Sequence, residues 1–173
     1  GPDPRRGFFA GYLKDDAATE EAWAGGWFHT GDVVRADSEN NLYFVDRKKN
    51  VIRRSGENIS AVEVESVLNM HPRVQASAVA AVPDAVRGDE VLACIAPRGE
   101  LRPQDRAAVA CSIVEHALAE LAYYKAPGYV AFVDALPLTP SQKIQRGELK
   151  ALAAALMGQP QCIDTTAMKK RQG

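Results

Sequence analysis

Asp32 is the first residue whose type and setting could do chemistry, because it follows a glycine in the triplet Thr30-Gly31-Asp32. A carboxylate placed after a glycine turn can accept two hydrogen bonds from a vicinal diol, as recognition of a ribose ring requires. A triplet of this kind is more often an ordinary turn. Alone, it therefore leaves both interpretations open.

The second candidate is a basic stretch within residues 46–60, where five of the eight residues from Arg47 to Arg54 are Lys or Arg. Strand-forming residues 42–45 and 51–52 flank turn-forming residues 48–50, which predicts a β-hairpin with cationic groups at its tip. Gly56 follows, at a point where a Cβ could be excluded. Residues 60–63 then fit a capping box, which predicts that a helix starts there.

Two ordinary interpretations compete for this basic stretch. Charged residues protect a solvated edge strand against unwanted pairing, and clustered cations also mark nucleic-acid or localisation patches. The second interpretation is disfavoured because Glu57, Glu63 and Glu65 follow immediately and the 173-residue chain has a net charge of −1.

The third candidate is Lys143, in the loop 136–144. Two prolines stiffen this loop, and small hydroxyl side chains precede its single lysine. A loop lysine considered alone is most simply a solvated surface charge.

The order of these residues resembles the core motifs of the adenylate-forming (AMP-binding) enzymes, a superfamily of acyl-CoA synthetases, peptide-synthetase adenylation domains and luciferases. Residues 26–32 are similar to its nucleotide-binding motif, and residues 46–59 to the motif that opens its C-terminal domain. Residues 124–127 are similar to its Tyr-Lys-x-Pro signature. The loop 136–144 is similar to its final motif, with Gln142 where glycine is usual.

The resemblance implies a role for four residues. Lys143 would stabilise the transition state in which a carboxylate attacks the α-phosphorus of ATP. Asp32 would hold the ribose hydroxyls, and Arg47 would add a second ribose contact. Lys49 matches the hinge about which the C-terminal domain rotates between the two half-reactions.

The resemblance also implies the substrates, which are a carboxylic acid, ATP (leaving as AMP) and CoA. Gly56 would let the pantetheine arm of CoA pass close to the backbone. Arg87 would meet the phosphates of the CoA nucleotide, although an exposed loop cation is its more ordinary interpretation. Mg²⁺ would accompany ATP through the N-terminal domain, and we expect no metal ligand in this chain.

Composition places the chain in a broad class. With 46% hydrophobic and 25% charged residues, it is typical of a globular protein large enough to bury a core. No apolar run reaches membrane-spanning length, and no secretory signal pattern opens the chain. The three cysteines are too far apart for a metal motif, so we expect reduced thiols and a cytoplasmic location.

Hydrophobic periodicity predicts the elements that must position these residues. Helices are expected at 15–23, 61–70, 103–121 and 148–157, and strands at 33–36, 42–45, 74–82, 91–96 and 129–133, with a turn at 37–41. The expected fold is α/β (α+β), with a small central sheet flanked by helices and preceded by the basic β-hairpin.

The expected domains are the end of an N-terminal adenylation domain at 1–46, a mobile C-terminal lid domain at 47–158, and a frayed tail at 159–173. The aromatic residues of 1–31, namely Phe8, Phe9, Trp23 and Trp27, are expected to pack on something outside this chain. The chain has no initiator methionine, and we expect it to be a piece of a longer protein. We expect it to be inactive alone, since no phosphate-binding loop occurs in it.

The function expected from the resemblance is that of the C-terminal portion of an ATP-dependent acyl-CoA ligase. Residues 53–60 look most like those of carnitine/crotonobetaine-type and medium- or long-chain fatty-acid ligases. Two alternatives remain open. One is a peptide-synthetase adenylation domain, whose acceptor is a carrier-protein thiol, and the other is a stand-alone binding module without catalysis.

Overall fold

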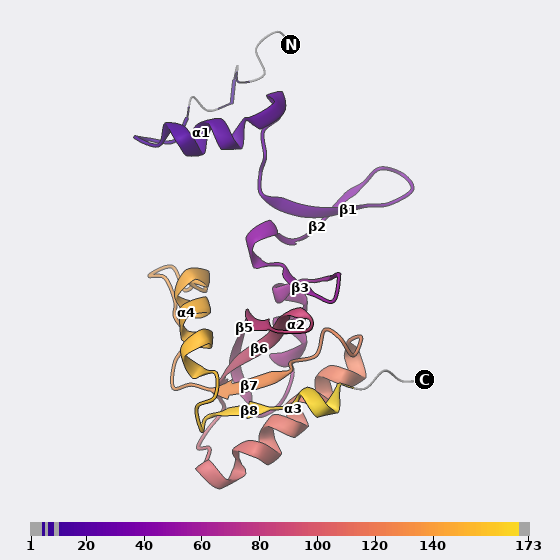
Figure 1. Ribbon diagram of the computed structural model, residues 1–173, viewed down its shortest axis with the longest axis vertical. Coiled ribbons are helices and arrows are strands. Elements are labelled where there is room, and N and C mark those ends of the chain that lie inside the picture. The colour runs from indigo at the N-terminus through magenta and orange to yellow at the C-terminus, as the bar shows by residue number, and fades with distance from the viewer. Residues whose placement is uncertain (1–4, 6, 9–10, 170–173) are drawn as a thin grey trace. The chain divides into compact units, whose positions relative to one another are not determined.

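The chain divides into two compact units, residues 1–49 and residues 50–173. The structure is a computed structural model that describes residues 5, 7–8 and 11–169. Figure 1 shows the helices and strands of each unit along the colour ramp of the chain.

The described part of the first unit contains one α-helix and one two-stranded sheet. Helix α1 (Asp16–Ala22) is capped by Asp15, whose carboxylate accepts a hydrogen bond from the Ala18 amide. A 3₁₀ turn at Ala24–Gly26 follows. Strands β1 (Asp32–Ala36) and β2 (Leu42–Arg47) pair antiparallel, with Asp32 opposite Arg47.

The second unit is built on a six-stranded sheet. Its strands are β3 (Ile52–Arg54), β4 (Glu57–Ile59), β5 (Val74–Asp84), β6 (Gly88–Pro97), β7 (Tyr129–Phe132) and β8 (Cys162–Asp164). The order is β4-β3-β6-β7-β8, and β5 also pairs with β6. Only the β6–β7 pair is parallel. Its crossover contains a helix, as parallel neighbours require.

Helices cover both faces of this sheet. Helices α2 (Ala61–Leu68) and α3 (Arg106–Glu120, after a 3₁₀ turn at Pro103–Asp105) pack into one apolar core. Helix α4 (Arg146–Leu156) packs into a second core on the other face. Strands β5 and β6 are covered on both sides, which explains their continuous apolar sequences. The expected sheet with flanking helices is confirmed.

The expected β-hairpin between residues 42–45 and 51–52 is wrong. Strand β2 pairs with β1, strand β3 pairs with β4, and Lys48–Asn50 form a 3₁₀ turn between the two hairpins. The turns that connect the paired strands lie at residues 37–41 and 55–56. Asp37 accepts hydrogen bonds from the Glu39 and Asn41 amides in the first hairpin, and Ser55-Gly56 adopts positive φ in the second.

The expectation of a frayed tail is wrong for residues 162–169. Strand β8 adds to the edge of β7, a 3₁₀ turn follows at Thr166–Met168, and the side chain of Lys169 is buried. The backbone of β8 finds its hydrogen-bond partners on β7, which is largely buried. The amino-acid composition of residues 159–173 gives no sign of this pairing. Residues 170–173 lie outside the described residues.

The expected exposure of the N-terminal aromatic residues is correct for some of them. Trp27 and Phe8 are 79% and 61% exposed, but Trp23 is only 7% exposed. Trp23 contacts the rings of Phe8 and Phe28 within its own unit. Phe9 lies outside the described residues.

Candidate functional site

Asp32 and Arg47 are brought together by the register of β1 and β2. The Arg47 Nε atom lies 2.9 Å from Asp32 Oδ1, and Arg47 also donates to the Thr30 carbonyl at 2.8 Å. Asp32 Oδ1 is itself buried, whereas both side chains as a whole remain partly exposed.

The backbone before Asp32 is fixed by a turn that needs glycine. Gly31 has a φ of 74°, a left-handed value that a side chain would disfavour. Its carbonyl accepts a hydrogen bond from the Lys48 amide at 2.7 Å, and the Asp32 amide donates to Thr30 Oγ1 at 3.1 Å. The carboxylate is therefore held at one position by local contacts on both sides of the hairpin.

Lys143 sits in a loop that is closed by its own hydrogen bonds. The Thr139 amide donates to the Lys143 carbonyl at 2.8 Å, and the Lys143 amide donates to Thr139 Oγ1 at 3.1 Å. Gln142 has a φ of 61°. This explains why glycine would suit that position, and it shows that glutamine also adopts the turn. The Lys143 side chain is exposed, and none of the described carboxylates forms an ion pair with it.

The loop is anchored by Arg146, the first residue of α4. Its guanidinium binds both carboxylate oxygens of Glu65, at 2.6 and 2.8 Å, and donates to the Val79 carbonyl at 3.2 Å. Glu65 also accepts from the Val79 amide. A bidentate pair with extra backbone contacts fixes geometry better than a single surface pair, so the base of the Lys143 loop is rigidly tied to α2 and β5.

Gly56 and Arg87 lie on neighbouring turns. The Ser55 amide donates to the Arg87 carbonyl at 2.8 Å, which joins the β3–β4 turn to the β5–β6 turn. Gly56 has a φ of 84°, yet a Cβ there would meet no atom within 4 Å. The requirement for glycine is therefore conformational rather than steric within this chain. Arg87 is paired with Asp84 at 3.6 Å.

Lys49 is the last residue of the first compact unit, and the second begins at Asn50. This division falls three residues after the boundary expected from the sequence, because strand β2 continues to Arg47 and the 3₁₀ turn follows it. The expected site residues therefore fall into two sets, with Asp32, Arg47 and Lys49 in one unit and Gly56, Arg87 and Lys143 in the other.

Two buried carboxylates of the second unit were not predicted from the sequence. Glu65 lies beside Val64 on the covered side of α2, and Glu90 is completely buried at the start of the apolar run of β6. Each lies beside residues that were expected to be buried. Because buried charges are almost always paired, this position could have predicted a buried ion pair.

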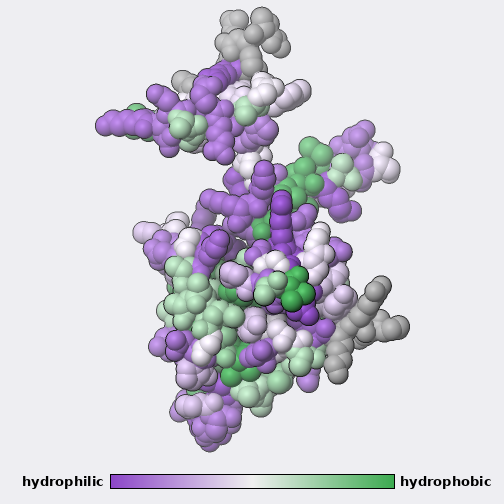
Figure 2. All heavy atoms as spheres, viewed as in Figure 1, coloured by the Kyte–Doolittle hydropathy of each residue, from purple (hydrophilic) through white to green (hydrophobic). Residues whose placement is uncertain are grey.

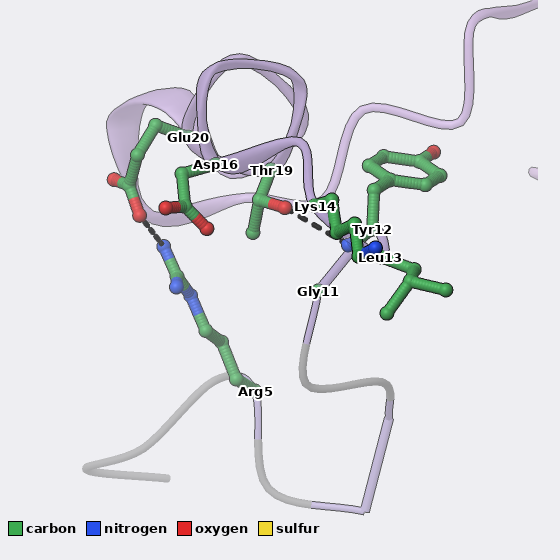
Figure 3. Close-up of a pocket in the computed structure, with 8 residues that line it drawn as sticks. All are labelled: Arg5, Gly11, Tyr12, Leu13, Lys14, Asp16, Thr19 and Glu20. Atoms are coloured by element: carbon green, nitrogen blue, oxygen red, sulfur yellow. Dashed lines mark hydrogen bonds and ion pairs between the residues drawn. The ribbon is translucent and has the colours of Figure 1, made fainter.

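A hollow in the first unit offers no comparable chemistry (Figure 3). One of its two cations, Arg5, already meets Glu20 at 3.1 Å, and the Thr19 hydroxyl accepts from the Tyr12 amide at 2.9 Å. In the described part of the chain, no cluster of His, Cys, Asp and Glu is arranged to hold a metal ion. No helix among the described residues is long and apolar enough to cross a membrane.

Comparison with known proteins identifies the fold. The family model described as the AMP-binding enzyme C-terminal domain matches residues 63–143. Residues 63–143 therefore belong to the AMP-binding enzyme C-terminal domain family. The long β5–β6 hairpin, α3 and the Lys143 loop all lie within the matched residues.

The chain is similar to several CoA ligases. It is 39% identical over 145 residues to a probable peroxisomal acyl-activating enzyme 5 of Arabidopsis thaliana, and 40% identical over 144 residues to the mitochondrial acyl-coenzyme A synthetase ACSM5 of Homo sapiens. Each alignment covers 83% of this chain and 25% of the relative. The chain thus spans about a quarter of the length of these curated relatives.

Solved structures agree with this assignment. The o-succinylbenzoate CoA synthetase of Bacillus subtilis, in complex with an acyl-adenylate intermediate, superposes with a TM-score of 0.70 at 33% identity, over 82% of this chain and 28% of that one. An anthranilate CoA ligase in complex with anthranoyl-AMP gives a TM-score of 0.71 at 32% identity, over 85% and 28% of the two chains.

Proposed function

We propose that this adenylate-forming domain serves an ATP-dependent acyl-CoA ligase, which converts a carboxylic acid to acyl-AMP and then to an acyl-CoA thioester. The observation that carries the proposal is the Asp32–Arg47 pair, a fixed carboxylate and cation at the end of a hairpin. The similarity to CoA ligases on both sequence and structure supports the same reaction.

In the first half-reaction, a carboxylate oxygen of the acid attacks the α-phosphorus of ATP, and the bond to pyrophosphate breaks. Asp32 would accept hydrogen bonds from the ribose hydroxyls, with Arg47 orienting that carboxylate and adding a contact to the sugar. Negative charge grows on the α-phosphate oxygens, and the exposed ammonium of Lys143 would stabilise it. Mg²⁺ would accompany ATP through the N-terminal domain.

In the second half-reaction, the CoA thiol attacks the acyl carbonyl and AMP leaves. The neighbouring turns that carry Gly56 and Arg87 would form the surface along which CoA approaches. Lys49, at the end of the first unit, would act as the hinge that exchanges the Lys143 loop for these turns.

The test is acid-dependent exchange of pyrophosphate into ATP by the complete product of the gene, screened over short-, medium- and long-chain and aromatic acids, followed by thioester formation with CoA. We expect exchange with at least one acid, and loss of exchange in Asp32→Ala. Exchange without transfer to CoA, but with transfer to a carrier-protein thiol, would instead favour a peptide-synthetase adenylation domain. Absence of exchange with every acid would favour a binding module.

We propose a cytoplasmic location. The described cysteines Cys94, Cys111 and Cys162 are all free thiols, which suits a reducing compartment such as the cytoplasm. The names of relatives include peroxisomal and mitochondrial proteins, and fractionation of cells expressing a tagged complete protein would distinguish the three.

A further inference from the structure

A buried charge cluster joins the C-terminal tail to the two turns that carry Gly56 and Arg87. Glu90 is completely buried and receives Arg54 Nε at 2.7 Å on one carboxylate oxygen, and the Lys169 ammonium on the other. The Val91 amide donates to the same oxygen as Lys169, at 2.9 Å. Arg54 and Lys169 are themselves 6% and 9% exposed.

Each member of this cluster belongs to a different structural element near the turns. Arg54 is the last residue of β3 before Ser55-Gly56, and it is paired with Gly88, the first residue of β6. The Ser55 amide bonds to the Arg87 carbonyl. Movement of the Arg54 backbone would therefore shift the Ser55-Gly56 turn and the Arg87-Gly88 turn together.

The tail is held against Glu90 by contacts of its own. Thr165 donates from its amide to the Gly128 carbonyl at 2.9 Å and from its hydroxyl to the Pro127 carbonyl at 3.1 Å. Gly128 packs so tightly on Glu90 that a Cβ would lie 2.6 Å from Glu90 Cγ. The Glu90 side chain is thus enclosed by β6, by the segment before β7 and by the tail.

The protonation state of Lys169 favours a structural ion pair with Glu90 rather than a role as a reactive amine. Burial lowers the pKa of Lys169 to about 8, with the Glu90 contacts opposing that effect and with Arg54 and Arg87 adding to it. A pKa of about 8 leaves Lys169 mostly protonated at neutral pH, so it binds Glu90 as a cation. Three cations, Arg54, Arg87 and Lys169, affect the charge at this site, and two of them, Arg54 and Lys169, form ion pairs with the single carboxylate of Glu90.

We propose that Lys169 is a positioning residue for the CoA-dependent half-reaction, because it holds Glu90 and Arg54 in place beneath the turns that carry Gly56 and Arg87. This proposal rests on the proposed acyl-CoA ligase function. Lys143 lies in a separate loop anchored by Arg146 and Glu65, so the tail should influence thioester formation and not adenylation. Removal of one partner from a buried ion cluster loosens the rest, since Glu90 then loses a charged hydrogen bond that water cannot easily replace.

The first measurement is amide hydrogen exchange of the 173-residue chain, comparing wild type with Lys169→Met, Lys169→Arg and Lys150→Met. Lys150 is an exposed lysine of α4 and provides the matched control. We expect Lys169→Met to reduce protection of the Ser55 amide about tenfold or more while the Ala93 amide in β6 keeps its protection. Lys169→Arg should retain most of the protection, and Lys150→Met all of it.

The second measurement uses the complete gene product. Lys169→Met should raise KM for CoA about tenfold in thioester formation from acyl-AMP, and should leave acid-dependent pyrophosphate exchange within about twofold of wild type. If Lys169→Met fails to fold, a chain ending at Thr165 keeps β8 and removes the lysine, and the same two results are expected from it.

Unchanged protection at Ser55 would overturn the proposal, as would an equal loss of both half-reactions. A wild-type protein that exchanges pyrophosphate with no acid would refute the proposed function. In that case, exchange at Ser55 would still decide whether the tail controls the turns.

Discussion

Asp32, Arg47 and Lys143 show how single residues acquire chemistry from local backbone geometry. Asp32 and Arg47 face each other because they occupy paired positions of one hairpin. Lys143 is presented by a loop whose hydrogen bonds run between Thr139 and Lys143 themselves. In both places, the backbone that carries the side chain is fixed before any ligand binds, which favours preorganised electrostatic stabilisation.

Replacement of Lys143 by alanine should separate the two half-reactions of the complete protein. We expect the rate of acyl-AMP formation to fall about 10²–10³-fold, because the α-phosphate loses its cation. Thioester formation from pre-made acyl-AMP should stay within a few-fold of wild type. Lys150→Ala is the matched control and should change neither rate. Equal loss of both steps in Lys143→Ala would show that the lysine is structural.

His71 should make the stability of the second unit depend on pH. Burial lowers the pKa of His71 from its ordinary value of 6.5, and the neighbouring His116 and Arg73 lower it further. The unfolded chain therefore binds a proton more readily than the folded one, and stability is lost as pH falls below about 6.5. Chemical denaturation at pH 7.5 and pH 5.5 should show this loss in wild type.

His71→Asn tests the origin of that pH dependence. An asparagine carbonyl can replace Nδ1 as the acceptor of the Arg73 amide, at present 3.2 Å away, but it does not titrate. We expect a smaller loss of stability between the two pH values in this variant. His29→Asn, at an exposed position, should lose as much stability between the two pH values as wild type. If His71→Asn also lost as much as wild type, the pH dependence would not come from His71.

At the scale of elements, the proposed hinge lies in the turn between two hairpins. The β1–β2 hairpin ends at Arg47, the β3–β4 hairpin begins at Ile52, and only the 3₁₀ turn Lys48–Asn50 and Val51 connect them. This short connection is the natural place for a change in backbone angles, because few pairing bonds have to break there.

Lys49→Pro should restrict that connection in the complete protein. Proline fixes φ and removes the amide donor, so rotation about residue 49 should be hindered. We expect thioester formation from acyl-AMP to fall at least tenfold while pyrophosphate exchange falls much less, the reverse of Lys143→Ala. Lys49→Ala keeps backbone freedom and is the control. If Lys49→Ala lost as much thioester formation as Lys49→Pro, the side chain would matter rather than the backbone.

At the scale of the whole chain, the two units have very different cores. Every member of the two apolar clusters of buried residues lies between Ile52 and Leu156. The first unit instead exposes apolar side chains on its hairpin, including Val34, Leu42 and Phe44. Figure 2 shows hydrophobic surface over β1 and β2. Exposed apolar surface of this kind is typical of an interaction face.

Residues 50–173 should fold without residues 1–49. Because none of the described residues of the first unit belongs to either core, we expect the thermal midpoint of the shortened chain to stay within about 4 °C of that of the 173-residue chain, a shift that corresponds to roughly 1 kcal/mol. Differential scanning calorimetry measures this directly. The contrasting variant ends at Gln161 and removes β8 and Lys169, and it should unfold at a clearly lower temperature. A large drop on removing residues 1–49 would show that the units depend on each other.

The sequence by itself determined most of the elements and the family. Apolar periodicity marked α2, α3 and α4 and the strands β5, β6 and β7, because each buries one or both of its faces. Residues 26–32 and 136–144 pointed to the AMP-binding enzymes, and the match of residues 63–143 to their C-terminal domain bears out that family. These features are local, so neighbouring residues suffice to specify them.

Only the tertiary structure decided which strands pair and which charges are buried together. On propensity alone, residues 42–45 could pair with the strand before them or the strand after them. In the structure, β1 pairs with β2 across the turn at 37–41, and β3 pairs with β4 across the turn at 55–56. Lys169 and Glu90 are 79 positions apart, and nothing local indicates that they meet. Strand pairing and charge burial depend on contacts between residues far apart in the chain, and these contacts exist only once the sheet has formed.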